Sequence, residues 1–419
     1  MIELEEHFYI TYRKLKAFCN SLAFYLCRVF PIKKNLVSVC TFEGKGGFGC
    51  NPKYIVQKLH EKNPDLEFVW FVNDMTKNFP NYIKKVPNTL WSRAYWLSQS
   101  KVWIDNYRKP YGTIKRKNQF YINTWHGELG FKTIGLWRGN AFSKMAQFVS
   151  ENDSKMIDLI PIESGWGKNM YPRGLLYGGE FLMSGSPRCD ALFGNMEVQR
   201  KRFREKHNIP EDSKIIMFAP TYRETAKNGK RSVLSEIWSI DFNRLLKSLS
   251  QKFGGNWFLC ARLHPQLAAF AKSEFDLSVN VIDASMDDDM YEDLAAMDAF
   301  LTDYSSAAFD ASLLRIPVFI YVDDLDSYKE SRGDLEWDLD SEHTVNVKNN
   351  ASVTPGIDTV LPYLVSQNND ELEKQILDFD SSVYFSRLEK FEKDIGLLFD
   401  GKGSERVASA IEATGLGGE

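Results

Sequence analysis

Short apolar runs alternate with longer amphipathic stretches along most of the chain. The first series begins at Leu36 and consists of the runs LVSVCTF, LEFVWFV, KVWIDN and QFYINTW. A second series follows the charged stretch at 198–207 and consists of KIIMFAP, NWFLCARLHP, VNVIDA, DAFLTD and IPVFIYV. Nearly continuous apolar strands separated by helical sequence are typical of parallel βαβ units, whose sheets are buried on both faces. The pattern therefore predicts an α/β protein with two doubly wound parallel sheets.

The chain is long enough for two domains, because its 419 residues exceed the usual size of about 100–200 residues per domain. We expect a Rossmann-like first domain at 36–195 and a Rossmann-like second domain at 196–380. A charged helical stretch at 381–419 ends the chain and could cross back to the first domain. Ligands of such sheets bind beyond the carboxyl ends of the strands, so function is expected in a cleft between the domains.

The N-terminal segment at 1–35 mixes apolar and basic residues without a strand pattern. Its part from Tyr9 to Lys34 predicts an amphipathic helix, which could lie in the headgroup layer of an anionic membrane. It could equally pack on the protein's own core or on another subunit. No apolar run approaches the length of about 20 residues that a helix needs to span a bilayer. The start of the sequence, MIELEEHF, is acidic, whereas a signal peptide begins with basic residues. We therefore expect a protein that is not exported by these signals.

The overall charge argues against nucleic acid as a partner, because 52 Lys and Arg are balanced by 56 Asp and Glu, a formal net charge of −4. Anions must therefore bind at local sites. The six cysteines are scattered, without the close spacing of zinc sites or of small disulfide frameworks. This spacing predicts reduced thiols in a cytosolic compartment and no structural metal.

The strand ends of the second series carry candidate phosphate-binding groups. The stretch LTDYSSAAFD leads from a strand into a helix, whose first N–H groups and hydroxyls suit a diphosphate, although an ordinary serine cap would look alike. Arg262 and His264 share a face of an extended segment and could neutralise a leaving phosphate, or they are a surface cation and a strand cap. Thr221 and Arg223 follow KIIMFAP and could also contact phosphate. The candidate phosphate-binding residues are Thr221, Arg223, Arg262, Asp303, Tyr304, Ser305, Ser306 and Asp310, and His264 is a catalytic candidate.

The first series offers candidates for the acceptor side. His126 directly follows a strand and can take a proton from an attacking hydroxyl near neutral pH, or it is merely hydrogen-bonded into the fold. The segment FEGKGGFGCNP lacks the GxGxxG and GK[ST] patterns, so it predicts either contact with a phosphorylated acceptor or a loop that needs positive φ angles. Arg188 and Asp190 of GSPRCD are expected to pair structurally. The predicted acceptor-binding residues are Glu43, Gly44, Gly47, Asn51, Gly127 and Lys132.

Taken in order, several motifs resemble the CDP-glycerol glycerophosphotransferase family, which includes teichoic-acid primases, polymerases and related capsule enzymes. The motifs are FEGKGGFGCNP, NTWHG, GSPRCDALF, FAPTYRE, RLHP and LTDYSSAAFD. The resemblance implies a GT-B fold, with an amino-terminal acceptor domain and a carboxy-terminal domain for the CDP donor. It also implies that an acceptor hydroxyl attacks the phosphorus nearer the polyol and that CMP departs. His126 then matches the general base, while His264 and Arg262 match the groups that steady the diphosphate and the departing CMP. The family's donor-site motif is matched by Asp303, Ser305, Ser306 and Asp310, so the candidate phosphate-binding residues of the second series become the predicted donor-binding residues.

The resemblance further implies the partners, which are CDP-glycerol or another CDP-polyol, a lipid-linked polymer acceptor and the inner face of the cell membrane. Two questions stay open: whether the protein forms a homo-oligomer, and whether Mg²⁺ binds at the donor diphosphate. Asp303 and Asp310 could supply ligands to this ion. Glu128-Leu129 replaces the family's usual Thr-Pro after His-Gly, which leaves glycerol phosphate, ribitol phosphate or a capsule repeat as the transferred group. Two alternative functions are a GT-B glycosyltransferase or epimerase that uses a nucleotide sugar, and a non-catalytic scaffold of polymer assembly.

Overall fold

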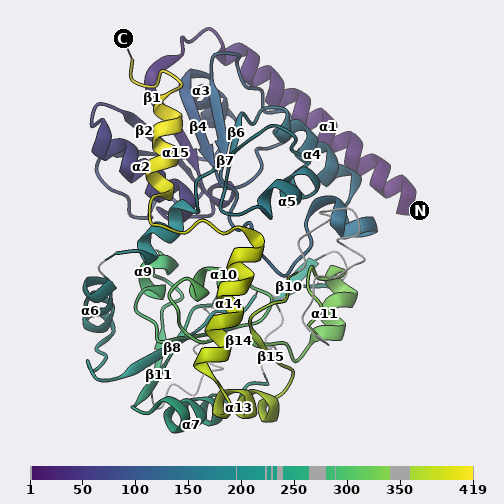
Figure 1. The fold of residues 1–419 in the computed structure, drawn as a ribbon. Coiled ribbons are helices and arrows are strands. Elements are labelled where there is room, and N and C mark those ends of the chain that lie inside the picture. The colour runs from purple at the N-terminus through teal and green to yellow at the C-terminus, as the bar shows by residue number, and fades with distance from the viewer. Residues whose placement is uncertain are drawn as a thin grey trace. The chain divides into compact units, whose positions relative to one another are not determined.

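The computed structural model describes residues 2–194, 196–221, 224–227, 230–233, 239–263, 280–287, 289–339 and 359–418. The chain folds into two compact units. Unit 1 contains 1–128, 134–190 and 397–419, and unit 2 contains 129–133 and 191–396. The chain therefore enters unit 2 briefly at 129–133 and returns to unit 1 at its end (Figure 1).

Unit 1 is built on a seven-stranded parallel sheet with the order β3-β2-β1-β4-β5-β6-β7. Strands β1, β2 and β4 are buried over most of their length, as expected for a sheet covered on both faces. The chain restarts at β4 beside β1, so the β1/β4 junction is the topological switch point. The strands are β1 (Lys33–Cys40), β2 (Glu67–Val72), β3 (Ile83–Pro87), β4 (Ser100–Asp105), β5 (Phe120–Asn123), β6 (Leu159–Ile162) and β7 (Glu180–Met183).

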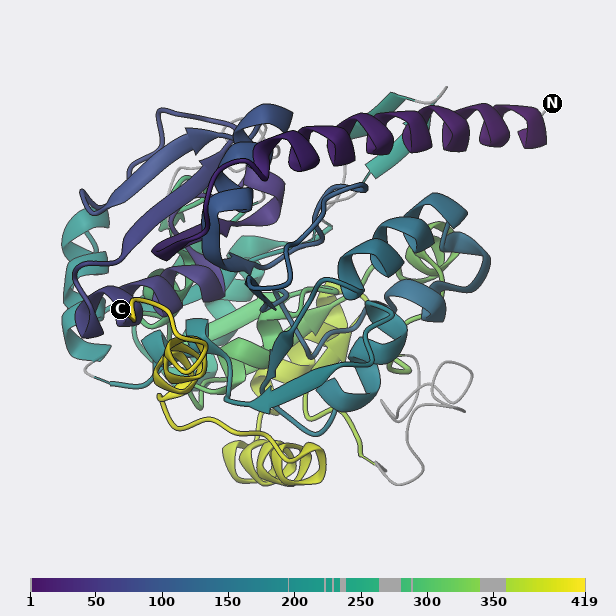
Figure 2. The ribbon, with the colours of Figure 1, turned by 90° about the horizontal axis from the view of Figure 1, so that it is seen from above.

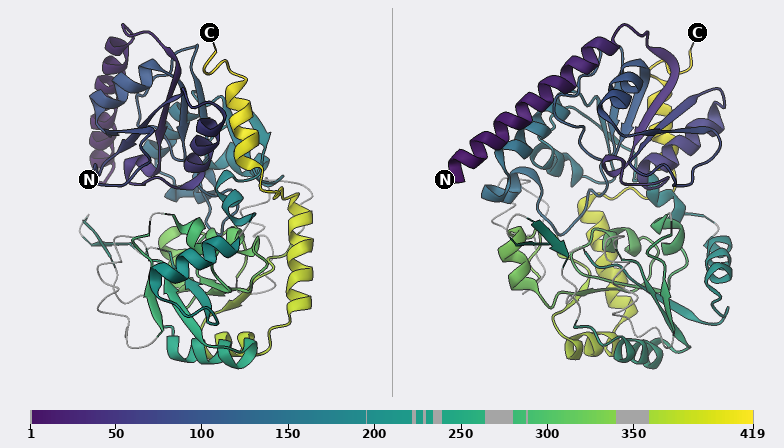
Figure 3. Two further views of the ribbon diagram at one scale, coloured as in Figure 1. Left: turned by 90° about the vertical axis from the view of Figure 1, so that its left-hand side faces the viewer. Right: turned by 180° about the vertical axis from the view of Figure 1, so that it is seen from behind.

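Helices flank this sheet on both sides (Figure 3). Helix α15 packs against α2, and its Val407 and Ile411 enter the same core as Val37 and Trp70. The last residues of the chain are thus part of the core of unit 1. The helices are α1 (Ile2–Cys27), α2 (Cys50–Lys62), α3 (Leu90–Gln99), α4 (Lys144–Ser154), α5 (Gly167–Gly174) and α15 (Gly403–Glu412), with the 3-10 turns η1 (Phe42–Gly44) and η2 (Gly135–Ala141).

Helix α1 is docked on unit 1 by its C-terminal half. Asn20 Nδ2 donates to the carbonyl oxygen of Tyr111 at 3.1 Å, and Ser21 Oγ donates to that of Gly112 at 2.9 Å. A side chain at Gly112 would collide with the α1 backbone at Ala17, because its Cβ would lie 2.2 Å from the Ala17 carbonyl oxygen. The N-terminal half of α1 extends away from the rest of the unit (Figure 2).

The predicted helix from Tyr9 to Lys34 is too long at its C-terminal end. Helix α1 ends at Cys27, and Lys33 and Lys34 belong to β1, where Lys33 is paired with Ser100 of β4. Two lysines that follow a segment of mixed apolar and basic residues fit the sequence pattern of an amphipathic helix. Strand pairing decides their conformation.

Unit 2 is built on a six-stranded parallel sheet with the order β12-β11-β8-β13-β14-β15. Its switch point lies between β8 and β13. Strand β9 (Glu224–Lys227) pairs antiparallel with β10 (Lys230–Val233). The sheet strands are β8 (Lys214–Phe218), β11 (Trp257–Ala261), β12 (Val281–Asp283), β13 (Ala299–Thr302), β14 (Val318–Tyr321) and β15 (Leu364–Ser366).

The segment 129–133 is fixed in unit 2 by core contacts. The ring of Phe131 lies 5.2 Å from that of Phe309, and Trp337 Nε1 donates to the carbonyl oxygen of Gly130 at 3.0 Å. The described helices of unit 2 are α6 (Met196–His207), α7 (Phe242–Phe253), α9 (Met290–Leu294), α10 (Ala307–Ser312), α11 (Leu325–Arg332), α13 (Asn369–Leu377) and α14 (Ser381–Ile395), and η3 (Pro187–Leu192) spans the unit boundary. The predicted α/β class with two doubly wound parallel sheets is confirmed.

Candidate functional site

In each unit, a hydrogen bond joins the two loops at the switch point. In unit 1, Phe42 N donates to Asn106 Oδ1 at 2.8 Å and links the loops after β1 and β4. In unit 2, Thr221 N donates to Asp303 Oδ1 at 2.8 Å and links the loops after β8 and β13. Because doubly wound folds bind their ligands at such points, these loop pairs are the candidate sites.

The candidate site of unit 2 brings several predicted residues together. Thr221 Oγ1 accepts a hydrogen bond from Lys132 Nζ at 3.3 Å, and Asp303 Oδ1 also accepts from Tyr304 N at 2.5 Å. Lys132 was predicted for the acceptor side, but it lies in unit 2 beside a predicted donor residue, since it bridges to Leu335 there. A cation and a hydroxyl in this arrangement suit phosphate oxygens.

The serine turn after β13 leads into α10 as the sequence predicted. Ser305 Oγ accepts from Ala307 N at 3.3 Å, and both Ser305 and Ser306 are half-exposed. Tyr304 is fully buried, with its hydroxyl 3.0 Å from Asp324 Oδ1 and its ring stacked on that of Tyr328 at 3.8 Å. The serine hydroxyls therefore face outward, while Tyr304 supports the turn from within.

Arg262 forms a buried ion pair inside unit 2. Its guanidinium donates to the main-chain oxygens of Ala284 and Asp287 and lies 3.2 Å from Asp293 Oδ2. Burial raises the pKa of Asp293 to about 7 in spite of this cation. Arg262 thus has a structural partner, and contact with a donor phosphate stays a prediction.

The carboxylates of Asp303 and Asp310 are both buried. Asp310 Oδ2 accepts from the Tyr291 hydroxyl at 2.7 Å, just as Asp303 accepts from main-chain N–H groups. Protein-bound Mg²⁺ usually keeps several waters, so its carboxylate ligands have to be open to solvent. The observed environment therefore suits a role in holding the turn better than it suits Mg²⁺. The predicted residues Arg223 and His264 lie outside the described residues.

His126 is the central group of the candidate site in unit 1. Its Nδ1 lies 2.8 Å from the main-chain oxygen of Asn106, which can only accept, so Nδ1 carries a proton, and in the neutral imidazole the lone pair is then on Nε2. The rings of Tyr107, Trp125 and Phe42 surround the imidazole at centroid distances of 5.6, 4.3 and 5.3 Å. A neutral imidazole held in one tautomer is the form that a general base requires.

Asn51 of α2 links the loop after β5, which contains His126, to the loop after β7. Its Nδ2 donates to the carbonyl oxygen of Trp125 at 3.3 Å, and its Oδ1 accepts from Arg188 N at 3.0 Å and from Ser186 Oγ at 3.2 Å. Arg188 also donates through its guanidinium to the main-chain oxygen of His126. The contacts of Asn51 thus hold the residue before His126 next to Ser186 and Arg188.

Asp190, the predicted partner of Arg188, caps helix α15. Its carboxylate accepts from Gly403 N at 2.9 Å and from Ser404 N at 2.7 Å. The GSPRCD motif therefore has two separate structural tasks, one beside His126 and one at the last helix of the unit.

The glycine-rich loop contains one glycine that its backbone requires. Gly44 has φ 81°, and a Cβ there would lie 2.6 Å from Asn88 Nδ2. The nearest atom to a Cβ at Gly47 would be Lys77 Cδ at 3.5 Å, an ordinary contact. Glu43 is exposed, and its carbonyl oxygen accepts from Asn88 Nδ2 at 2.6 Å. The backbone angle and the packing therefore require a glycine at position 44. They place no such requirement on position 47 or on the side chain of Glu43.

Glu128 is a buried carboxyl that follows the His-Gly pair. Its Oε2 accepts from Glu163 N at 2.8 Å, and its Oε1 accepts from Gly167 N at 2.9 Å and from the Ser164 hydroxyl. Burial and the charge of Glu163 raise the pKa of Glu128 to about 8. Gly127 and Glu128 border a hollow of about 10 Å³, room for a single water, which is also lined by Asn51, Thr124, Pro161, Glu163, Tyr171, Gly185, Ser186 and Pro187.

Non-glycine residues with left-handed backbone gather at this edge of unit 1. Phe42, Glu43, Cys50 and Trp125 have φ values of 47°, 56°, 57° and 48°. Conformations of this kind cost about 1–3 kcal/mol each and cluster at functional sites. The strain supports a functional role for this edge of the sheet.

Sequence reasoning missed Asn106, Tyr107, Arg108 and Asn123. Arg108 packs its guanidinium 4.9 Å from the ring centre of Trp125 and donates to the carbonyl oxygen of Gly174 at 2.8 Å. Asn106 is fully buried, and its Nδ2 has no hydrogen-bond partner among the described residues. The position of Asn106 directly after β4, beside the switch point, was the signal that could have identified it.

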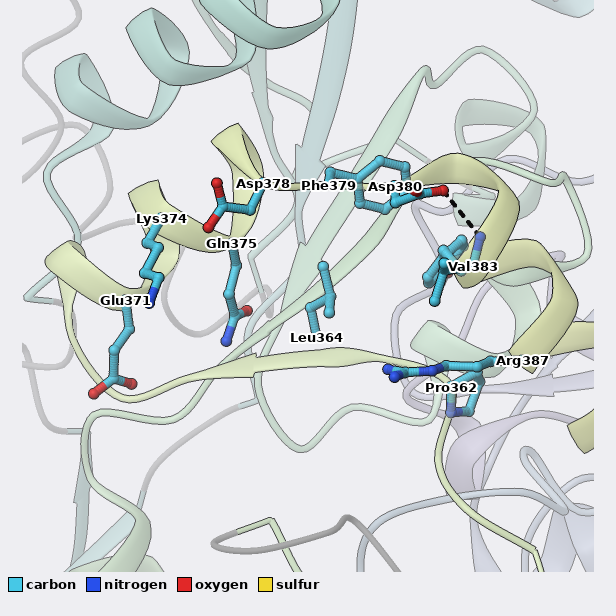
Figure 4. A pocket seen from close by; sticks show the side chains of 11 residues that line it. Pro362, Leu364, Glu371, Lys374, Gln375, Asp378, Phe379, Asp380, Val383 and Arg387 are labelled. Atoms are coloured by element: carbon cyan, nitrogen blue, oxygen red, sulfur yellow. Dashed lines mark hydrogen bonds between the residues drawn. The ribbon is translucent and has the colours of Figure 1, made fainter.

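A larger hollow of about 390 Å³ lies in unit 2 between β15, α13 and the start of α14 (Figure 4). It lies near the amino end of β15, whereas the candidate groups follow the carboxyl ends of strands. Among the described residues, no predicted site residue lines it. Its lining residues are Pro362, Leu364, Glu371, Lys374, Gln375, Asp378, Phe379, Asp380, Val383, Tyr384 and Arg387.

Across the described ranges, no helix combines the length and the apolar character needed to cross a membrane, and this includes α1.

Comparison with known proteins identifies similar sequences over most of the chain. A teichoic acid poly(glycerol phosphate) polymerase of Bacillus subtilis is 26% identical over 76% of this chain and 43% of its own length. The corresponding polymerase of Staphylococcus epidermidis is 28% identical over 68% of this chain and 40% of its own length, so this chain spans less than half of either protein. A teichoic acid glycerol-phosphate transferase of Staphylococcus aureus is 25% identical over 90% of this chain and 93% of its own length.

The fold also matches a solved structure. The wall teichoic acid polymerase TagF superposes on 97% of this chain and 97% of its own with a TM-score of 0.75 and 22% identity, which supports the predicted GT-B fold. The sequence model described as CDP-Glycerol:Poly(glycerophosphate) glycerophosphotransferase matches residues 22–413. Because this match includes nearly all of both sheets, the chain belongs to the CDP-glycerol:poly(glycerophosphate) glycerophosphotransferase family.

Proposed function

We propose that this protein transfers a polyol phosphate, most simply glycerol phosphate, from a CDP-activated donor to a hydroxyl of a teichoic-acid or capsule-type acceptor. CMP is the second product. The observation that carries the proposal is the setting of His126, a half-buried imidazole whose Nδ1 is bound to the Asn106 carbonyl at the end of a parallel strand. Family membership supports the CDP-activated donor, and this geometry supports His126 as the base.

The proposed step is a direct displacement. His126 Nε2 takes the proton of the acceptor hydroxyl while the hydroxyl oxygen forms a bond to the phosphorus nearer the polyol. The bond from that phosphorus to the oxygen shared with CMP breaks, and CMP leaves with the electron pair. A positioned general base of this kind is worth about 10²–10⁴-fold in rate.

Unit 2 is the proposed donor unit. Lys132 Nζ and the Thr221 hydroxyl lie 3.3 Å apart, and the half-exposed hydroxyls of Ser305 and Ser306 belong to the neighbouring loop of the same switch point. These groups could compensate the charge that develops on the diphosphate as CMP leaves. Unit 1 is the proposed acceptor unit, with Glu43, Gly47 and Gly127 as contact candidates.

A donor panel tests the proposed function. The full chain is incubated with a glycerol-phosphate acceptor and with CDP-glycerol, CDP-ribitol or a UDP-sugar, while nucleotide release and product mass are measured. We expect CMP release and a product heavier by one polyol phosphate per turnover. Release of UDP without CMP would instead identify a nucleotide-sugar enzyme. Binding of CDP-glycerol without any turnover would favour a scaffold.

We also propose that α1 attaches the protein to an anionic membrane surface. Phe8, Tyr12, Leu15, Leu22 and Leu26 recur at spacings of three, four and seven along α1, so they share one side, and each is at least 49% exposed. Lysines on the same helix, Lys14 and Lys16, add charge that anionic headgroups attract. Exposed aromatic and aliphatic residues next to basic ones are typical of helices that lie in a bilayer surface.

Vesicle sedimentation tests the attachment. We expect the full chain to bind vesicles that contain phosphatidylglycerol, to bind neutral phosphatidylcholine vesicles less well, and to lose binding after the combined changes Phe8→Ser, Leu15→Ser and Leu22→Ser. The variant should keep its thermal stability, because these side chains face solvent. If the wild-type chain ignores vesicles but self-associates through these residues, α1 is a subunit contact and the membrane proposal is wrong.

A further inference from the structure

One buried amide, that of Asn123 at the end of β5, holds both loops that surround His126. Asn123 is fully buried; its Oδ1 accepts from Trp125 N at 2.9 Å, and its Nδ2 donates to the carbonyl oxygen of Tyr107 at 3.1 Å. Trp125 immediately precedes His126, and the ring of Tyr107 stacks on the imidazole with an interplanar angle of 16°. A single side chain therefore fixes the backbone on one side of the imidazole and the ring that covers it.

The contact with Trp125 stabilises an unusual backbone conformation. Trp125 has φ 48°, a left-handed value that a bulky residue adopts rarely. When an Asn side chain accepts from the N–H two residues later, it forms an Asx-turn, which holds the chain in a tight local bend. Without this bond, we expect Trp125 to relax and to turn His126 away from the Asn106 carbonyl.

The rest of the amide environment explains why Asn is needed here. Asn123 Nδ2 also lies 3.2 Å from the Tyr121 hydroxyl and 3.3 Å from Asp153 Oδ2. The carboxamide offers an acceptor to Trp125 N from its oxygen and a donor to the Tyr107 carbonyl from its separate nitrogen, so it reaches both groups at the same time. An Asp would place a second buried carboxylate beside Asp153, and an apolar residue would leave both main-chain groups without this partner.

We propose that Asn123 is a positioning residue that sets the tautomer and the orientation of His126. It keeps the imidazole against the Asn106 carbonyl, so that Nε2 is the nitrogen that receives the proton. The expected effect on turnover rests on the proposed function. The effect on His126 itself can be measured without any substrate.

The experiment compares Asn123→Ala and Asn123→Ser with Tyr121→Phe as the matched control. The Ser hydroxyl can still accept from Trp125 N–H, so this variant keeps part of the turn and protects the test if the Ala variant does not fold. Tyr121→Phe removes the hydroxyl that accepts from Asn123 Nδ2 and donates to Asp153, and it leaves the bonds of Asn123 to Trp125 N and to the Tyr107 carbonyl in place. Tautomers are measured by NMR on the full chain with ¹⁵N-labelled histidine, with the His126 signals identified from a His126→Asn sample, and kcat and KM are measured with CDP-glycerol.

We expect the wild type and Tyr121→Phe to hold the Nδ1–H tautomer at His126. Asn123→Ala should populate both tautomers and lower kcat at least tenfold, with the KM for the donor within twofold and the Ser variant in between. A folded Ala or Ser variant with the wild-type tautomer and kcat would overturn the proposal, as would an equal loss in Tyr121→Phe. A tautomer change in a protein whose wild type releases no CMP would support the positioning role and refute the proposed function.

Discussion

The Nδ1 atom of His126 lies 2.8 Å from the main-chain oxygen of Asn106, and this contact ties the loop after β5 to the switch point of unit 1. Asn106 also accepts from Phe42 N through its side chain, so one residue contacts both the imidazole and the loop after β1. The imidazole of His126 is thereby held next to the place where a doubly wound sheet binds its ligand.

Replacement of His126 by Asn tests the assigned base. The carboxamide can still hydrogen-bond within the site, but it cannot take a proton, so we expect kcat to fall by about 10²–10⁴-fold. The Kd for CDP-glycerol should change little, because the proposed donor groups lie in unit 2. Measurement of CMP release and of donor binding by calorimetry checks both expectations, and an unchanged kcat would remove His126 from the mechanism.

The Arg262–Asp293 pair allows a structural role of Arg262 to be separated from donor binding. Arg262→Ala leaves the buried Asp293 carboxyl without its cation, which typically costs about 3–5 kcal/mol of folding free energy. The double variant Arg262→Ala with Asp293→Asn removes that charge as well and should recover much of the lost stability in urea unfolding. If the recovered double variant binds CDP-glycerol as tightly as wild type, Arg262 acts only on the fold. A persistent loss of binding would support its predicted contact with the donor.

Most strands could be predicted from the sequence because their apolar runs are continuous. The strands outside the predicted series show why the pattern fails elsewhere. Strand β6 is the short run LIPI with Pro161 inside it, β7 is an edge strand whose residues are partly or fully exposed, and β15 has three residues. Short or half-exposed strands carry little periodicity, and their place is decided by neighbours that are distant in sequence.

The candidate site shows the same limit for single residues. The position of His126 after a strand predicts a site residue, whereas Asn106 ends the run KVWIDN and Asn123 lies within QFYINTW, where the pattern predicts strand residues. Their importance depends on strand order, since Asn106 borders β1 only because β4 returns beside it. The order of the strands in the sheet cannot be derived from these apolar runs alone. The left-handed backbone at Trp125 was equally hidden, because tryptophan gives no local signal for positive φ.

The buried carboxyl of Glu128 should make stability depend on pH. Its pKa is raised to about 8 by burial and by the charge of Glu163, so the folded state binds its proton more tightly than the unfolded state does. The stabilisation is complete at acidic pH and is lost as pH rises from about 5 towards about 8, with a slope of at most about 1.4 kcal/mol per pH unit for one group. Glu128→Gln should flatten this part of the profile.

Urea unfolding of the wild type and of Glu128→Gln, at intervals between about pH 5.5 and about pH 8.5, measures the slope directly. A constant offset of about 1–2 kcal/mol is expected, since the amide cannot accept from all three donors that Glu128 now binds. Asp153, whose pKa burial raises to about 7, titrates in both proteins and so cancels in the comparison. Parallel profiles would show that Glu128 stays ionised in the folded state.

Alanine at Gly44 and at Gly47 distinguishes the backbone role of the glycine-rich loop from contact with the acceptor. Gly44→Ala forces a side chain onto φ 81° and into Asn88, so we expect a loss of about 1–3 kcal/mol in thermal or urea unfolding. Gly47→Ala meets only an ordinary contact with Lys77 and should change stability by less than about 0.5 kcal/mol. If the acceptor approaches this loop closely, Gly47→Ala should nevertheless raise the KM for the acceptor while the KM for CDP-glycerol stays constant. Equal acceptor KM in Gly47→Ala and wild type would mean that the loop serves the fold of unit 1 and does not contact the acceptor at this position.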